Sequence, residues 1–65
     1  MIANQLLHYR CQKDLSQHQL AQRAGVTAST IQRIERGRHA AQPRTQYRLA
    51  GALGVPVQDV FPQAA

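Results

Sequence analysis

Apolar residues in this chain recur every three or four positions, and no segment alternates apolar and polar residues over the length of a strand. The pattern therefore predicts an all-α protein with five helical segments. Candidate capping residues set the helix boundaries. The predicted helices cover about residues 2–12, residues 17–24, residues 28 to about 36, residues 43–53, and one last short turn over 57–61.

The apolar face of each predicted helix indicates the core. These faces are Ile2, Leu6 and Tyr9 with part of Leu7 in the first helix; Leu20, Ala21 and Ala24 in the second; Ile31 and Ile34 in the third; Leu49, Ala50 and Leu53 in the fourth; and Val57, Val60 and Phe61 at the end. Tyr47 lies at the margin of the fourth helix's apolar stripe. We expect these faces to meet in one small core.

Small residues mark where the central helices begin and end. Ser16 and Thr27 have the hydroxyl groups preferred at helix N-caps. Gly25 and Gly37 supply the left-handed backbone that ends a helix. Pro43 suits the first position of the fourth helix, where its missing N–H costs nothing. Two short helices joined by a glycine turn are therefore predicted over about residues 16–37.

The second of these two helices has one polar, cationic side. At 100° per residue its outward positions fall within roughly 140° of one another. They are Ala28, Ser29, Gln32, Arg33 and Arg36. A solvated surface helix has a similar composition, so this face alone leaves both interpretations open. The preceding helix and its glycine turn favour a helix presented to DNA.

The charge of the chain points to a polyanionic partner. Eight Lys and Arg residues against three Asp and Glu residues give a net charge of +5 and a pI near 10.8. A membrane surface would require a broad apolar helix face, and the basic stretch offers only Ile31 and Ile34. We therefore expect double-stranded DNA as the partner and no membrane association.

Cysteine usage and hydropathy limit the cellular setting. Cys11 is the only cysteine, which excludes an internal disulfide and a cysteine-based zinc site and fits a reducing compartment. The sequence has no signal peptide and no apolar run as long as a membrane span. The expected location is the cytoplasm.

Four segments carry a resemblance to a known family. Ala21 is small where two helices must cross, and Gly25 follows at the turn. The segments are LSQ at 15–17, LAQRAGV at 20–26, STIQRIERG at 29–37 and RLAGALGV at 48–55. Over about residues 6–61 the chain resembles the DNA-binding domain of Cro and the phage repressors, the XRE family.

The resemblance implies a fold, a domain organisation and a source. The fold is a compact five-helix bundle of the λ-repressor-like type, in which the second and third helices form the helix-turn-helix. Residues 1–65 are expected to make a single DNA-binding domain with a short tail at 62–65. A bacterial or phage origin follows from the resemblance alone.

The same resemblance implies how DNA is read. The second motif helix would enter the major groove, with base-reading positions at Ala28, Ser29, Gln32 and Arg33. Arg33 suits guanine, Gln32 suits adenine or a phosphate, and Ala28 suits a thymine methyl group. The expected contacts to the DNA backbone are Gln17, Thr27, Arg36, Arg38 and Arg44. For Gln17, Arg38 and Arg44, a solvated surface position remains the alternative.

Other polar residues have structural explanations. The resemblance implies an ion pair between Arg10 and Glu35 that joins the first and third helices. Asp14 stands where the family usually has glycine, and Asp tolerates left-handed backbone better than most residues. Pro43 and Gln46 occupy positions that are commonly large and apolar, so the fourth helix is expected to have a thinner apolar face.

The sequence offers no sign of catalysis or of a cofactor. His8, His18 and His39 lack metal-ligand spacing, and no cluster of acids or cysteines completes a site. His39 lies in the basic loop, where a phosphate contact is the alternative role. We expect no metal, no catalytic residues, no cofactor and no small-molecule ligand.

These observations indicate a transcriptional regulator, and most simply a repressor that binds a palindromic operator as a homodimer. Candidate interface residues are Val55, Pro56, Val57 and Val60. Phe61 belongs either to the core or to that interface. The alternative is an antitoxin-like protein that binds a partner protein and autoregulates through DNA. Such proteins usually carry an extra partner-binding segment, and only residues 62–65 lie beyond the predicted domain, which favours the regulator.

Overall fold

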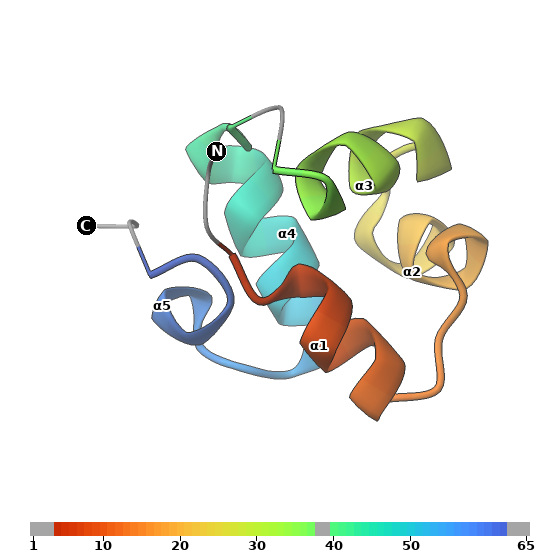
Figure 1. Cartoon of the computed structure of the whole chain (residues 1–65), viewed down its shortest axis with the longest axis horizontal. Coiled ribbons are helices and arrows are strands. Elements are labelled where there is room, and N and C mark those ends of the chain that lie inside the picture. The colour runs from red at the N-terminus through yellow and green to blue at the C-terminus, as the bar shows by residue number, and fades with distance from the viewer. Residues whose placement is uncertain (1–3, 38–39, 63–65) are drawn as a thin grey trace.

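The computed structural model describes residues 4–37 and 40–62, and these residues form five helices (Figure 1). The helices are α1 (Leu6–Gln12), α2 (Gln17–Ala24), α3 (Ala28–Glu35), α4 (Pro43–Leu53) and α5 (Val57–Val60). The two described ranges contain no strand. The predicted all-α class is confirmed.

The helices are arranged around α4, which runs through the middle of the molecule (Figure 1). α2 packs against both α3 and α4, α5 packs on α4, and α1 contacts α3. In Figure 1, α2 and α3 lie together on one side of α4, and α5 lies on the other. This is the λ-repressor-like bundle implied by the resemblance, with α2 and α3 as the helix-turn-helix.

Every helix contributes to one core. The most completely buried large side chains are Leu6, Leu20, Ile31, Ile34, Leu49 and Val60. Burying an aliphatic side chain of this size contributes about 1.5–3 kcal/mol. The predicted inner faces of α2, α3 and α4 are confirmed, and Phe61 belongs to the core. Leu15, which the apolar pattern did not assign to the core, is buried as well, whereas Leu7 and Tyr47 are exposed.

The ends of α2 follow from its sequence. The Ser16 side chain accepts a hydrogen bond from the backbone N–H of Gln19 at 3.0 Å, and the Gln19 side chain accepts one from the Ser16 N–H at 2.9 Å. This reciprocal capping box satisfies two N–H groups at the helix start. Gly25 ends the helix with φ 71°, in the left-handed region.

Thr27 then caps α3, because its hydroxyl accepts a hydrogen bond from the backbone N–H of Thr30 at 3.1 Å. α3 ends at Glu35, with Arg36 as its C-cap, one residue earlier than predicted. Between α1 and α2, Asp14 has φ 57°, as expected of a residue that replaces glycine. In α4, the thinner apolar face leaves Gln46 free to donate a hydrogen bond to the Ala41 carbonyl at 3.0 Å.

The first helix starts later than predicted. Asn4 and Gln5 are not helical, and α1 begins at Leu6. The side chain of Asn4 accepts a hydrogen bond from the Leu6 N–H at 3.0 Å, and the Gln5 N–H donates to the Val60 carbonyl at 2.8 Å. These two bonds compete with a helical path through residues 4 and 5. The predicted start at Ile2 is therefore wrong, and Ile2 itself lies outside the described residues.

Candidate nucleic-acid interface

The recognition helix α3 divides into an apolar face and a polar face. Ile31 and Ile34 point into the core and are 0% and 1% exposed. Ser29, Gln32 and Arg33 are exposed on the opposite side, followed by exposed Arg36 at the C-cap. Because the buried face is anchored, the side of the helix that bears these polar residues faces outward.

Two residues at the start of α3 are less free than the sequence indicated. Ala28 is partly buried and packs against the core. Thr27 is exposed, but its hydroxyl oxygen is bonded both to the Thr30 N–H and, at 2.9 Å, to the Thr30 hydroxyl. Its capping role therefore occupies the side chain in the free protein.

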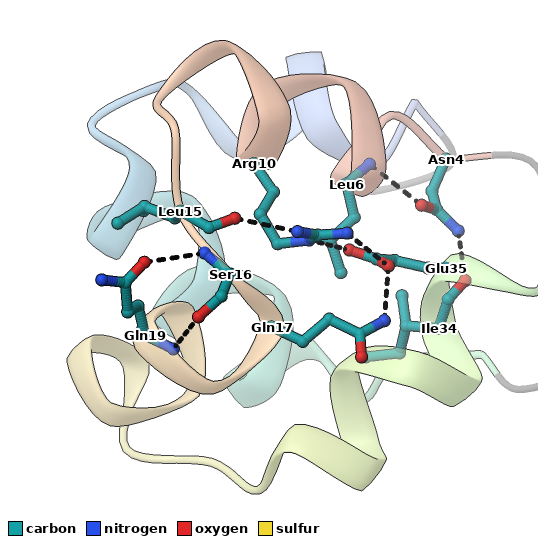
Figure 2. A network of polar contacts seen from close by, with 9 residues as sticks. All are labelled: Asn4, Leu6, Arg10, Leu15, Ser16, Gln17, Gln19, Ile34 and Glu35. Atoms are coloured by element: carbon teal, nitrogen blue, oxygen red, sulfur yellow. Dashed lines mark hydrogen bonds and ion pairs between the residues drawn. The ribbon is translucent and has the colours of Figure 1, made fainter.

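A polar network joins the last residue of α3 to α1 and α2 (Figure 2). The Glu35 carboxylate lies 2.5 Å from Arg10 Nε through Oε2 and 3.2 Å from a second guanidinium nitrogen through Oε1. Gln17 Nε2 donates to the same Oε1 at 2.9 Å. The side chains of Arg10 and Glu35 are only 14% and 7% exposed, so the pair is largely shielded from water. The ion pair implied by the resemblance is present.

Arg10 also ties this network to the chain between α1 and α2. Its remaining guanidinium nitrogen donates to the Leu15 carbonyl at 2.8 Å. The hydrogen bond to Glu35 holds the pKa of the Arg10 guanidinium above its ordinary value, against the opposing effect of burial. A raised pKa on a cationic group stabilises the fold below that pKa, so this contribution is constant across neutral pH.

Gln17 occupies a different place from the one expected. Its side-chain amide nitrogen is bonded to Glu35 and links the first residue of α2 to the last residue of α3. The side chain is half-buried rather than extended into solvent. The free backbone N–H groups at the start of α2 remain as the means by which this position can meet a phosphate.

The other arginines that the structure describes are available to an external anion. Within residues 4–37 and 40–62, the ion pair found is that between Arg10 and Glu35. Arg33, Arg36 and Arg44 are exposed, with Arg44 in the first turn of α4. Arg38 and His39, which the sequence placed in the basic loop, lie outside the described residues. These exposed arginines, which have no ion-pair partner among the described residues, are placed to contact an anionic partner.

The candidate interface at the C-terminal end divides into accessible and buried residues. Pro56 is exposed, and Val55 and Val57 are partly buried at the turn between α4 and α5. Val60 is 0% exposed and packs in the core. The expectation that Val60 forms part of an interface is therefore wrong for this structure, because its side chain contacts the rest of the chain itself.

Histidine and cysteine side chains form no metal-binding cluster in the described part of the chain. Cys11 is exposed on α1. None of the helices described has the length and apolar content needed to cross a membrane.

Sequence reasoning missed the structural roles of three residues, one that caps α2 and two that hold α3. Gln19 was recognisable, because Ser followed three residues later by Gln is the capping-box pattern. Asn4 carried a weaker sign, as an asparagine two residues before a helix. The bond between Gln17 and Glu35 has no sequence signature, since it depends on how α2 and α3 cross.

In this five-helix bundle, a helix with a polar, cationic outer face follows a glycine turn. This arrangement defines a helix-turn-helix DNA-binding protein. The comparison with protein families agrees, because residues 6–60 match the helix-turn-helix family model. The chain belongs to this family, in its Cro and phage-repressor branch. It is a DNA-binding transcriptional regulator.

Two relatives extend this assignment. The chain is 34% identical over 58 residues to an HTH-type transcriptional regulator of Methanocaldococcus jannaschii, an alignment that covers 89% of this chain and 88% of the relative. It is 39% identical over 54 residues to an HTH-type transcriptional regulator of Methanothermobacter thermautotrophicus, with 82% and 78% covered. Both relatives are archaeal, so family membership does not by itself fix a bacterial or phage source.

Proposed function

We propose that the protein is a sequence-specific repressor that binds a palindromic operator as a homodimer. The outward face of α3 carries this proposal, because it presents exposed Ser29, Gln32 and Arg33 while Ile31 and Ile34 fix the helix to the core. Side chains with hydrogen-bonding capacity on a rigid helix are what reading base edges in the major groove requires.

Within this face, Arg33 is assigned to guanine through paired bonds to O6 and N7, and Gln32 to adenine or an adjacent phosphate. Ser29 is assigned to a neighbouring base edge. Ala28 offers a methyl group to thymine. Because Ala28 is partly buried, this contact requires the start of α3 to lie close to the base. These assignments follow the family's docking mode, in which the N-terminal part of the recognition helix meets the bases.

Phosphate contacts are assigned to residues around this helix. Arg36 and Arg44 are exposed, and neither forms an ion pair with another residue of 4–37 or 40–62. Arg38 joins them on sequence grounds alone. For Gln17 and Thr27 the structure supports contact through the backbone rather than the side chain, because both side chains are engaged within the protein. Such contacts position the protein without reading sequence.

The homodimer is assigned to the turn between α4 and α5, where Val55, Pro56 and Val57 form a small apolar surface. The proposal requires that two copies joined there present both recognition helices to one duplex, because two-fold dimers of this class read half-sites about one helical turn apart. A small interface of this kind fits a protein whose dimer forms when two copies bind adjacent half-sites.

Sedimentation of the protein with an operator duplex tests this assignment. Val57→Lys is expected to abolish the complex of two protein chains per duplex while leaving binding to an isolated half-site intact. Gln58→Lys adds the same charge at the next, exposed position of α5 and is expected to retain the two-to-one complex. Equal stoichiometry for both variants contradicts this interface.

Repression is tested by transcription in vitro from a template whose promoter overlaps the operator. We expect transcript to fall as the protein saturates the operator, because the bound dimer blocks polymerase. A rise in transcript contradicts repression without contradicting specific DNA binding.

A further inference from the structure

The segment preceding α1 holds three helices together. Asn4 Nδ2 donates to the Ile34 carbonyl in the last turn of α3 at 2.9 Å, and Asn4 Oδ1 accepts the Leu6 N–H that starts α1 at 3.0 Å. The next residue, Gln5, donates its N–H to the Val60 carbonyl at the end of α5 at 2.8 Å. Two consecutive residues therefore connect α1, α3 and α5.

The bond from Asn4 meets α3 where a helix needs support. Carbonyl groups in the last turn of a helix lack partners within the helix. The Ile34 carbonyl accepts the Gly37 N–H at 3.0 Å, and the Asn4 amide adds a second, long-range donor. Figure 2 shows Asn4 reaching Ile34 beside the Glu35 network. The C-terminal end of the recognition helix is thus fixed from α1 as well as from α2.

The two contacts to α3 differ in what they connect. The Glu35 network joins α3 to α1 and α2 but, within the described residues, makes no bond to α5. The segment at Asn4 and Gln5 also reaches α5, at its last residue Val60, while the turn at 55–57 assigned above to the dimer lies at the other end of this short helix. The contacts therefore run from the DNA-reading helix to the C-terminal end of α5, whose first residue, Val57, belongs to that turn.

We propose that Asn4 is a positioning residue for DNA reading, which sets the recognition helix α3 relative to α5 and so relative to the second copy on the operator. This inference rests on the proposed function. Displacement of α3 weakens base contacts, because hydrogen bonds require donor–acceptor distances of about 2.7–3.2 Å and near-linear geometry. Two half-sites at a fixed separation add the same demand for the distance between two α3 helices.

The test compares Asn4→Ser with Gln5→Ser. Serine at position 4 keeps an oxygen that can accept the Leu6 N–H but is too short to reach the Ile34 carbonyl. Gln5 has an exposed side chain and makes its bond to Val60 through the backbone, so Gln5→Ser is the control; it keeps that bond and places a preferred capping residue at the N-cap of α1. Both proteins are measured against a duplex selected from a random pool and against its scrambled sequence, at a temperature where circular dichroism shows them folded.

Asn4→Ser is expected to lower the ratio of specific to scrambled affinity about fivefold, the factor that corresponds to one net hydrogen bond. Gln5→Ser is expected to stay within about twofold of the parent protein, a factor that is less than half of one such bond. A folded Asn4→Ser variant with the parent ratio, or an equal loss in both variants, overturns the proposal. If Asn4→Ser does not fold, Asn4→Asp, which keeps the acceptor and loses the donor, is compared with Gln5→Glu in the same way.

Backbone amide chemical shifts of the DNA-free protein separate this inference from the proposed function. Asn4→Ser is expected to shift amides along α3 and in α5, whereas Gln5→Ser leaves both helices unchanged. Shifts confined to residues 4–7 overturn the coupling. Equal binding of the parent protein to all duplexes contradicts the proposed function instead, and the amide shifts then decide the coupling by themselves.

Discussion

Gln17 Nε2 lies 2.9 Å from Glu35 Oε1, so the first residue of α2 is hydrogen-bonded to the last residue of α3. The same carboxylate is paired with Arg10 of α1. Glu35 therefore fixes the angle between the two motif helices and the first helix. Gln17, for which the resemblance implies a phosphate contact, also holds the reading helix in place in the DNA-free protein.

Gln17→Met tests this role. Methionine keeps the length of the side chain and removes the hydrogen bond to Glu35, which predicts a loss of about 1 kcal/mol in the free energy of unfolding. The salt dependence of DNA binding is expected to stay unchanged, because no phosphate contact by the side chain is lost. Urea denaturation and a salt titration measure the two effects. Gln22→Met, at an exposed position of the same helix, is the control, and equal stability of the two variants contradicts the role of Gln17.

Glu35→Gln is expected to destabilise the protein by about 2 kcal/mol. The substitution leaves the largely buried Arg10 guanidinium without its anionic partner, and an amide satisfies it less well than a carboxylate. Asp14→Asn removes the same charge at an exposed site and is expected to change stability by less than about 0.5 kcal/mol. Denaturation of the two variants side by side isolates the ion pair, and similar losses for both would point to net charge instead.

Substitution of alanine for glycine is expected to change the free energy of unfolding in opposite directions at Gly25 and Gly51. Gly25 has φ 71°, and a Cβ added there would meet no atom within 4 Å, so Gly25→Ala suffers from backbone strain alone and loses about 1 kcal/mol. Gly51 lies within α4, also with open space around it, so Gly51→Ala gains about 0.5–1 kcal/mol from helix propensity. Thermal unfolding of both variants measures the sign of each change. Lower stability of Gly51→Ala would contradict the open space found around Gly51.

Arg33 and Arg36 are expected to differ in the kind of affinity they supply. Arg33→Ala should cost about 1–3 kcal/mol on the selected site and relax the preference at one position per half-site. Arg36→Ala should weaken binding equally on all sequences and reduce the salt slope by about one unit. Competition assays with single-base variants of the site distinguish the two. A uniform loss from Arg33→Ala would make Arg33 a phosphate contact.

The sequence predicted most of the fold because its local rules agree with one another. Ser16, Gly25 and Thr27 mark helix ends through bonds to residues a few positions away, and the structure shows each of them in that role. The buried faces of α2, α3 and α4 follow equally from helical periodicity. These features require no knowledge of how the helices pack.

The errors lie where distant segments compete for the same backbone or side-chain groups. Helical periodicity extended the first helix back to Ile2, but residues 4 and 5 bond to α3 and α5, and the helix begins at Leu6. Val60 is apolar near the end of the chain, and only the packing of α5 on α4 shows that it is core. The hydrogen bond between Gln17 and Glu35 could not be predicted either, since the two residues are eighteen positions apart.

Selection of duplexes from a random DNA pool at physiological salt tests the central claim most directly. The account predicts enrichment of a two-fold symmetric site whose half-sites lie about one helical turn apart, with a guanine opposite Arg33. Binding without enrichment of any sequence would contradict a specific operator-binding regulator.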